Sequence, residues 1–235
     1  IVARNLARTI AAGASAHSDH GRDILETLHI VGEGKSDVYQ ISEPEKLHQL
    51  AEEYGVSIDG KSDQELAAEL SWEMMEDYGM RREKLPLAGR APAARQEIWE
   101  KTGVYPRGVD RENVETLHRT HMGVDNDWVN ILLHAVRNSL SDGWGGSMIA
   151  TELSDVLFGI PKPNSSSVNL GVLKADHVNI ILHGHNPMLS EVIVAASQYE
   201  EILAMAQEKG AQGINLAGLC CTGNEVLMRK GIPMA

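Results

Sequence analysis

The chain has few aromatic residues, very little cysteine and no long apolar run. Phe, Trp and Tyr make up 4% of its 235 residues, and Cys220 and Cys221 are its two cysteines. Adjacent cysteines cannot cross-link distant parts of a fold, so a disulfide scaffold is excluded and a reducing cytoplasm is expected. No apolar stretch approaches the roughly 20 residues of a membrane-spanning helix.

Positive charge is also scarce. The 21 Lys and Arg residues are outnumbered by 33 Asp and Glu residues, which gives a formal net charge of -12 at pH 7. Negative charge repels phosphate backbones and anionic lipids, so nucleic acid and anionic membranes are disfavoured as partners. A hydrophobic content of 43% nevertheless allows a sizeable core in one or two domains.

The first 160 residues have the pattern of a helical domain. Apolar residues recur at helical spacing from Val2 to Leu28 and predict one long helix. Patterns that begin at Ser42 and at Ser62 predict capping boxes for the next two helices. Further helices are expected over residues 93–102, 111–121, 128–140 and 147–157. A Pro- and Ser-rich stretch that begins at Pro161 then predicts a linker.

Residues 161–235 alternate between β-rich and helical segments. The expected order is a strand at 178–182, a helix from Pro187 to Lys209 with Asn186 as N-cap, a strand at 214–219 and a last helix. This order describes a βαβα unit with parallel strands, the start of a Rossmann-like α/β domain. The predicted fold class is therefore α followed by α/β.

The last helix is expected to begin with a capping box formed by Thr222 and Glu225. A parallel sheet of two strands is not self-sufficient. The chain also starts at Ile1 rather than at Met. We therefore expect it to be an interior section of a longer protein.

Four residues that can bind metal follow the two predicted strands. His183 and His185 come at the end of the first strand, and Cys220 and Cys221 come directly after the second. Carboxyl ends of neighbouring parallel strands lie about 4.8 Å apart and border the crevice where such sheets bind ligands. A position just before a helix N-terminus favours the metal-binding thiolate, most of all at Cys221, which directly precedes the predicted Thr222 cap.

This set of donors favours a soft transition metal or an iron–sulfur centre with further ligands elsewhere. Structural zinc fits less well, because it usually takes spaced cysteine pairs. The alternative is a buried pair of thiols and a histidine that bonds to the backbone.

Three further patterns have a plain structural interpretation. His17 and His20 are neighbours on one helix face and could pass protons, but spacing alone favours a solvated face with incidental histidines. His118 and His121 repeat this spacing near a helix end, where capping is the preferred interpretation. The stretch GWGG from Gly143 lacks the Lys and Ser/Thr of a phosphate loop and predicts a tight connection between helices.

Six stretches together resemble the catalytic subunit of anaerobic nickel-dependent carbon monoxide dehydrogenase. In chain order they are AAGASAHSDHGRD, LHRTHMGVDND, DGWGGSMIATELSDVLFGIPKP, VNLGVL, VNIILHGHNPMLSEVIVAA and GINLAGLCCTGNEVLMRKGIP. The resemblance implies an oxidoreductase that interconverts CO and CO2 with water and releases two protons and two electrons. It also implies a cytoplasmic homodimer with a ferredoxin-like electron acceptor and, in some members, acetyl-CoA synthase as a partner; association with membranes would occur only through partners.

The resemblance implies roles for five residues. His185 and Cys221 would bind the pendant iron of a nickel–iron–sulfur cluster of the C-cluster type, with Cys220 as a close neighbour. His17 and His20 match the first two members of a proton-relay helix in which histidine recurs at every third residue.

The chain departs from this pattern at the next relay positions, which are Asp23 and Glu26. The resemblance also implies [4Fe-4S] clusters, further cluster cysteines and a substrate-steadying lysine whose positions lie outside this section. The section alone is therefore expected to be inactive.

Two other classes of protein remain as alternatives. The hybrid-cluster proteins (hydroxylamine-reductase-like) share the architecture and similar crevice ligands, although HGHNPMLSE and CCTGNE fit them less well. A non-catalytic, acidic helical interaction module with a structural Cys/His cluster is the second alternative.

Overall fold

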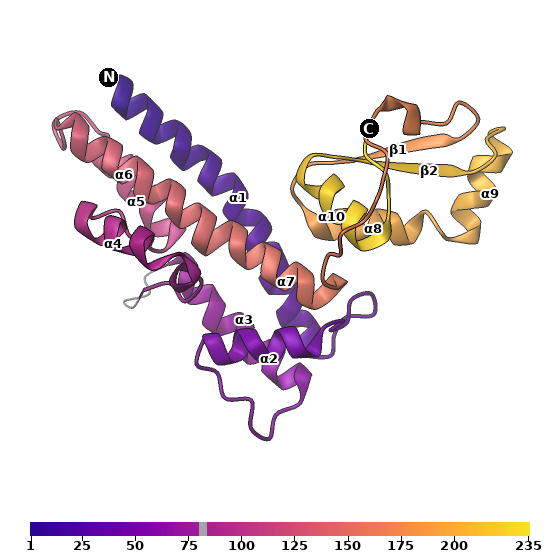
Figure 1. Cartoon of the computed structure of the whole chain (residues 1–235), viewed down its shortest axis with the longest axis horizontal. Coiled ribbons are helices and arrows are strands. Elements are labelled where there is room, and N and C mark those ends of the chain that lie inside the picture. The colour runs from indigo at the N-terminus through magenta and orange to yellow at the C-terminus, as the bar shows by residue number, and fades with distance from the viewer. Residues whose placement is uncertain (80–83) are drawn as a thin grey trace. The chain divides into compact units, whose positions relative to one another are not determined.

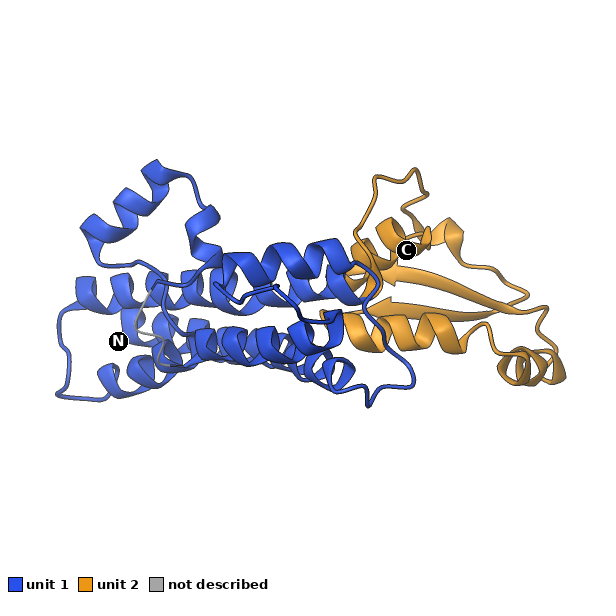
Figure 2. Cartoon of the chain, turned by 90° about the horizontal axis from the view of Figure 1, so that it is seen from below, with its two compact units in different colours: residues 1–157 blue, residues 158–235 orange. Residues whose placement is uncertain are grey.

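The computed structural model describes residues 1–79 and 84–235, which divide into two compact units (Figure 2). Unit 1, residues 1–157, is helical, and unit 2, residues 158–235, contains a two-stranded parallel sheet with helices. The predicted fold class is confirmed. Among the described residues, no helix has both the length and the apolar character needed to cross a bilayer.

Unit 1 consists of helices that pack against one another (Figure 1). Its elements are α1 (Val2–Gly32), α2 (Pro44–Glu53), α3 (Asp63–Met75), η1 (Glu76–Tyr78), η2 (Leu87–Arg90), α4 (Ala93–Thr102), α5 (Val109–Arg119), α6 (Trp128–Ser141), η3 (Asp142–Ser147) and α7 (Met148–Phe158).

Helix α1 is the centre of unit 1 and packs against α3, α5, α6 and η3. The prediction of one long helix here is confirmed. Its first half buries small side chains, and Ala7 packs with Ile131 and Ala135 of α6, which runs alongside (Figure 1). Its second half buries larger side chains such as Ile24 and Leu28. Small residues allow the two backbones to come close, and the larger ones fill the core where α3 approaches.

One of the two predicted capping boxes in unit 1 is present. The Ser62 side chain accepts a hydrogen bond from the Glu65 N–H, and the Glu65 carboxylate accepts one from the Ser62 N–H. The box at Ser42 is wrong, because Ser42 Oγ donates to the Leu157 carbonyl at 2.7 Å and α2 has no side-chain cap. Pro44 at the first turn of α2 already removes one N–H that a cap would serve.

The predicted tight connection at Gly143 to Gly146 is also wrong. These residues lie in η3, a π-helical segment between α6 and α7. Gly145 and Gly146 are buried, and a Cβ on Gly145 would lie 3.1 Å from Leu85 Cδ1. The glycines therefore permit close packing of a helix rather than a turn of the chain. Such π segments are frequent at functional sites.

Unit 2 has β1 (Val178–His183), α8 (Pro187–Ala196), α9 (Glu200–Glu208), β2 (Ile214–Leu219), α10 (Cys220–Lys230) and the short turn η4 (Leu170–Val172). The strands are parallel, with pairs from Val178 with Ile214 to His183 with Leu219. Helix α10 packs on both strands and on α8. A small core forms around Leu182, Val226 and Ile232.

The helix predicted between the two strands of unit 2 needs correction. The segment predicted as one helix from Pro187 to Lys209 is two helices, α8 and α9. Ser197 Oγ donates to the Val194 carbonyl at 2.7 Å, and this local bond competes with continuation of the helix. The Asn186 cap of α8 is confirmed by a hydrogen bond from the Leu189 N–H at 3.2 Å.

The predicted capping box at Thr222 is wrong. Helix α10 begins at Cys220, directly after β2, so Thr222 lies inside the first turn, where it is buried. The tertiary contact of this turn with β2 takes the place of a side-chain cap.

Candidate functional site

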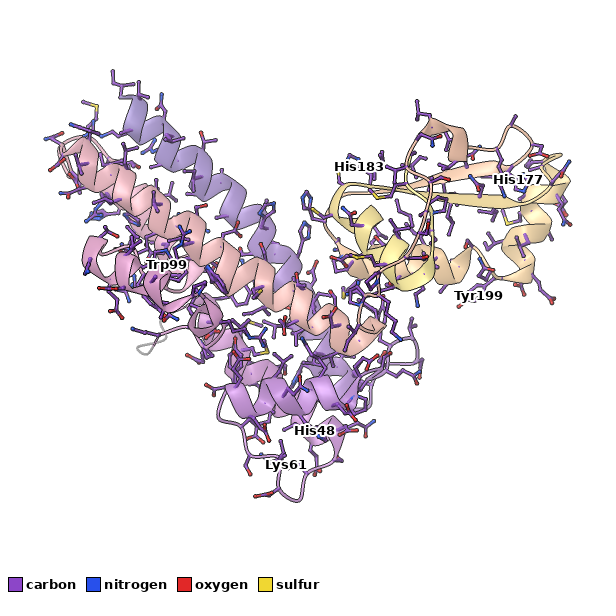
Figure 3. All side chains as sticks on the ribbon, in the orientation of Figure 1. His48, Lys61, Trp99, His177, His183 and Tyr199 are labelled. Carbon is purple, nitrogen blue, oxygen red and sulfur yellow. The ribbon has the colours of Figure 1, made fainter. Side chains whose placement is uncertain are left out.

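The two strand ends bring the predicted metal-binding residues to one edge of the sheet. His183 pairs with Leu219 in the parallel register, so Cys220 follows directly beside the end of β1. The Thr222 N–H donates to the Gly184 carbonyl at 3.0 Å and joins the two connecting segments. Figure 3 shows His183 at the opposite end of β1 from His177. This placement agrees with the expectation from the sequence that the donors lie at the ends of neighbouring strands.

The backbone is strained at the cysteine pair. Among the residues that the structure describes, Cys220 is the one non-glycine residue with a positive φ, 57°. This left-handed conformation costs an L-residue about 1–2 kcal/mol. Backbone strain of this kind clusters at binding and catalytic sites, where the surrounding structure maintains it.

A pair of glycines holds the cysteines in place. A Cβ on Gly218 would lie 2.5 Å from Gly223 Cα, and a Cβ on Gly223 would lie 2.7 Å from the Gly218 carbonyl carbon. Only residues without a side chain allow this contact between β2 and the first turn of α10. The sequence interpretation missed it, although Gly223 lies within the CCTGNE motif.

The donors at this edge fit a metal–sulfur cofactor. His183, His185, Cys220 and Cys221 are all exposed, and both thiols are free. Thiolate and imidazole are ligands that iron, nickel and iron–sulfur centres accept, whereas magnesium and calcium prefer oxygen ligands. Two thiols adjacent in the chain and on a strained turn do not provide the spaced pairs of a structural zinc site.

The second candidate site is the histidine pair on α1. His17 and His20 are half-buried and one turn apart on this helix. His17 Nδ1 lies 3.0 Å from Asp142 Oδ2 in η3. Burial raises the pKa of Asp142, and the hydrogen bond and charge of His17 only partly offset this effect. Asp142 was missed at the sequence level, because its contact with His17 spans 125 residues.

A third cluster has the residue types of a metal site. Ligand atoms of Glu112, Glu115 and His134 all lie within 4.8 Å of one another. Arg137 Nε lies 2.7 Å from Glu112 Oε2, and Arg107 contacts both carboxylates. The arginines already neutralise these carboxylates and would repel a cation. The cluster is therefore an ion-pair network of unit 1.

The electrostatics of Glu112 agree with this assignment. Burial by itself would raise the pKa of Glu112, but hydrogen bonds from His134 and Arg137, with the charge of Arg107, lower it to about 2.

The helix predicted to end near His118 is α5. His118 and Arg119 lie in its last turn, the position that favours cations.

Comparison with known proteins places the whole chain in one family. The model of the Prismane/CO dehydrogenase family matches residues 1–235. Carbon monoxide dehydrogenase 1 of Methanosarcina mazei is 58% identical over 235 residues, which are 100% of this chain and 37% of that protein. Carbon monoxide dehydrogenase 1 of Carboxydothermus hydrogenoformans is 46% identical over 241 residues, again 100% of this chain and 37% of that protein.

A solved structure has the same fold. The Ni-free carbon monoxide dehydrogenase from Thermococcus sp. AM4 superimposes with a TM-score of 0.93 at 53% identity, over 100% of this chain and 37% of that one. The chain thus spans a little over a third of the length of these relatives. It belongs to the Prismane/CO dehydrogenase family.

Proposed function

We propose that this chain is a section of the catalytic subunit of an anaerobic carbon monoxide dehydrogenase. The reaction would interconvert CO and CO2 with water and release two protons and two electrons. The observation that carries the proposal is the hydrogen bond from the Thr222 N–H to the Gly184 carbonyl, which joins the segments that follow the two strands. It occurs in a chain that is 58% identical to a carbon monoxide dehydrogenase. The relatives described above do not favour a hybrid-cluster protein or a non-catalytic module.

In this proposal His185 and Cys221 bind one iron of a nickel–iron–sulfur cluster, and Cys220 is their close neighbour. When bound, the cluster supplies the binding site for CO and takes up two electrons. The chain's contribution is a rigid edge, because backbone contacts at Gly184, Thr222 and Gly223 fix both connecting segments. The remaining ligands and the [4Fe-4S] clusters come from parts of the protein outside this chain.

Proton transfer is assigned to the face of α1. The carboxylate of Asp142 accepts from His17 Nδ1, orients the ring and stabilises the imidazolium that forms when His17 takes a proton. His20 lies one turn further and provides the next site for the proton. Asp23 and Glu26 continue this series at the same spacing with carboxylates, which also carry protons.

The wider assembly is proposed from the same family. We propose a cytoplasmic homodimer that passes electrons to a ferredoxin-like acceptor. A relative that is 44% identical, from Moorella thermoacetica, is named carbon monoxide dehydrogenase/acetyl-CoA synthase subunit beta, which supports acetyl-CoA synthase as a further partner. We also propose a domain boundary near residue 160, between a helical domain and a longer Rossmann-like domain.

The test is a histidine replacement in the full-length enzyme. His185→Ala should abolish CO oxidation and lower the iron content of the cluster. His177→Ala is the matched control, because this histidine lies at the other end of β1, and it should leave CO oxidation unchanged (Figure 3). Retained CO oxidation with intact nickel in His185→Ala would refute the ligand assignment. Turnover of hydroxylamine but not CO by the wild-type enzyme would refute the activity.

A further inference from the structure

Tyr78 of η1 occupies a notch in the histidine-bearing helix. It is 2% exposed, and a Cβ on Gly21 of α1 would overlap its hydroxyl. The guanidinium of Arg22 lies over the tyrosine ring, 5.2 Å from its centroid. Gly21 follows His20 in α1, the helix that carries the proposed proton relay. Because Gly21 has no side chain, the Tyr78 hydroxyl fits against this helix.

Two buried polar atoms flank the contact between α1 and η3. Within residues 1–79 and 84–235, neither Tyr78 Oη nor Asp142 Oδ1 has a hydrogen-bond partner. A Cβ on Gly21 would lie 2.9 Å from the Gly146 carbonyl oxygen, and a Cβ on Gly146 would lie 3.5 Å from Asp142 Oδ1. Both atoms therefore border the place where Gly21 meets Gly146. Buried polar groups in proteins are almost always hydrogen-bonded, either to protein or to an internal water.

We propose that Tyr78 is a positioning residue for the His17–Asp142 pair and acts through one internal water at the Gly21–Gly146 contact. The water accepts a hydrogen bond from Tyr78 Oη and donates to Asp142 Oδ1. Its second hydrogen points to the Gly146 carbonyl, which gives it the three partners typical of a buried water. Asp142 Oδ2 then stays directed at His17. This inference rests on the proposed proton-transfer role of His17.

The chemistry of the two partners agrees with these roles. Burial raises the pKa of Tyr78 far above its usual range, so the hydroxyl remains protonated and serves as a donor. Burial also raises the pKa of Asp142, and a hydrogen bond donated to its carboxylate stabilises the charged form against that effect.

The other charged groups around this contact are already paired or lie further along the network. Arg22 of α1 binds Asp110 of α5 at 2.7 Å and Asp19 at 3.0 Å. Asp77 of η1 accepts from the Tyr54 hydroxyl at 2.6 Å. Arg90 of η2, which also packs near η3, pairs with Glu53 and Glu152. His17 pairs with Asp142 directly, with 3.0 Å between Nδ1 and Oδ2.

The experiment compares Tyr78→Phe with the wild type in the full-length protein. The carboxyl C=O band of Asp142 is followed against pH by difference infrared spectroscopy of the metal-free protein and is identified by its loss in Asp142→Asn. Loss of the donated hydrogen bond should raise the midpoint of this titration by about half to one pH unit. Tyr105→Phe is the matched control, because its hydroxyl donates to Gln96 at 3.1 Å, and it should leave the midpoint unchanged.

A high-resolution crystal structure of the full-length protein should show one water within hydrogen-bonding distance of Tyr78 Oη and Asp142 Oδ1. An unchanged midpoint in Tyr78→Phe, or a crystal structure without this water, would overturn the inference. A higher melting temperature of Tyr78→Phe would also overturn it, since removal of an unsatisfied buried hydroxyl stabilises a protein. The infrared titration needs no turnover, so a failure of the proposed function, seen as no CO oxidation by the wild type, is a separate result.

Discussion

The Thr222 N–H donates to the carbonyl of Gly184 at 3.0 Å, across the two segments that follow β1 and β2. One segment carries His185 and the other begins with the cysteine pair. A backbone hydrogen bond of this kind does not depend on the side chains that it positions. The sheet and this hydrogen bond therefore bring the backbones of the two segments together.

Replacement of Gly223 by Ala should disturb this arrangement. The added Cβ would lie 2.7 Å from the Gly218 carbonyl carbon, so β2 and α10 must move apart. We expect a loss of about 1–3 kcal/mol in the free energy of unfolding and a lower iron and nickel content. Denaturant unfolding of the metal-free protein and metal analysis of the purified enzyme measure the two effects.

The matched control for this glycine is Gly13→Ala in α1. In the part of the chain that the structure describes, no atom lies within 4 Å of a Cβ at this position. Alanine in a helix is more favourable than glycine by about 0.5–1 kcal/mol, so this variant should be at least as stable as the wild type with unchanged metal content. An equal loss of metal in both variants would contradict the role of the Gly218–Gly223 contact.

Cys220→Gly should stabilise the metal-free protein. Glycine adopts the φ of 57° without strain, so the gain should be about 1 kcal/mol. Cys221→Gly places glycine in a helical turn without such strain and should destabilise by about 0.5–1 kcal/mol. Denaturant unfolding of both variants tests whether the two changes in the free energy of unfolding have opposite signs.

Iron analysis of the same two full-length variants tests the choice of ligand. Cys221→Gly should lose more cluster iron than Cys220→Gly, because Cys221 is the proposed ligand. The reverse order would assign the iron to Cys220.

Asp142→Asn should slow CO oxidation by about 100-fold, within the range that general acid–base groups contribute. The amide keeps the shape of the side chain but removes the charge that stabilises a protonated His17. Steady-state kinetics of the full-length enzyme measure this change. Glu115→Gln, a carboxylate of the arginine network on α5, should leave the rate unchanged.

The stability of Asp142→Asn should also depend on pH. Because burial raises its pKa, Asp142 binds a proton more tightly in the folded than in the unfolded protein. The resulting stabilisation is present below the unfolded pKa and disappears as the pH rises through the folded pKa. The free energy of unfolding of Asp142→Asn minus that of the wild type should therefore be more positive at pH 7 than at pH 4. Denaturant unfolding at the two pH values that gives the opposite trend would contradict this.

Glu112→Gln should destabilise unit 1 at neutral pH. The pKa of Glu112 falls from 4.5 to about 2 in the folded protein, which corresponds to about 3 kcal/mol. Because the folded pKa is lower, this stability is present above pH 4.5 and is lost as the pH falls towards 2. Unfolding measured at pH 7 and at pH 3 should show a difference from the wild type that is clearly larger at pH 7 than at pH 3.

Local patterns predicted much of the secondary structure. The Ser62–Glu65 box, the Asn186 cap and strand 214–219 are present as expected. Each of these features depends on residues that lie close together in the chain. The predictions at Ser42 and Thr222 failed for a complementary reason, since the Ser42 hydroxyl bonds to Leu157 and Thr222 is buried in a turn packed on β2.

The amino-acid sequence alone determined the fold class, the two strands and the order in which His185 and Cys221 follow them, because apolar periodicity and motif order are local properties. Only the tertiary structure decided that Asp142 meets His17, that Tyr78 occupies the Gly21 notch and that Cys220 has a strained backbone. These features arise where segments far apart in the chain come into contact. Whether a hydroxyl, a carboxylate or a missing side chain fits at such a contact depends on both segments at once.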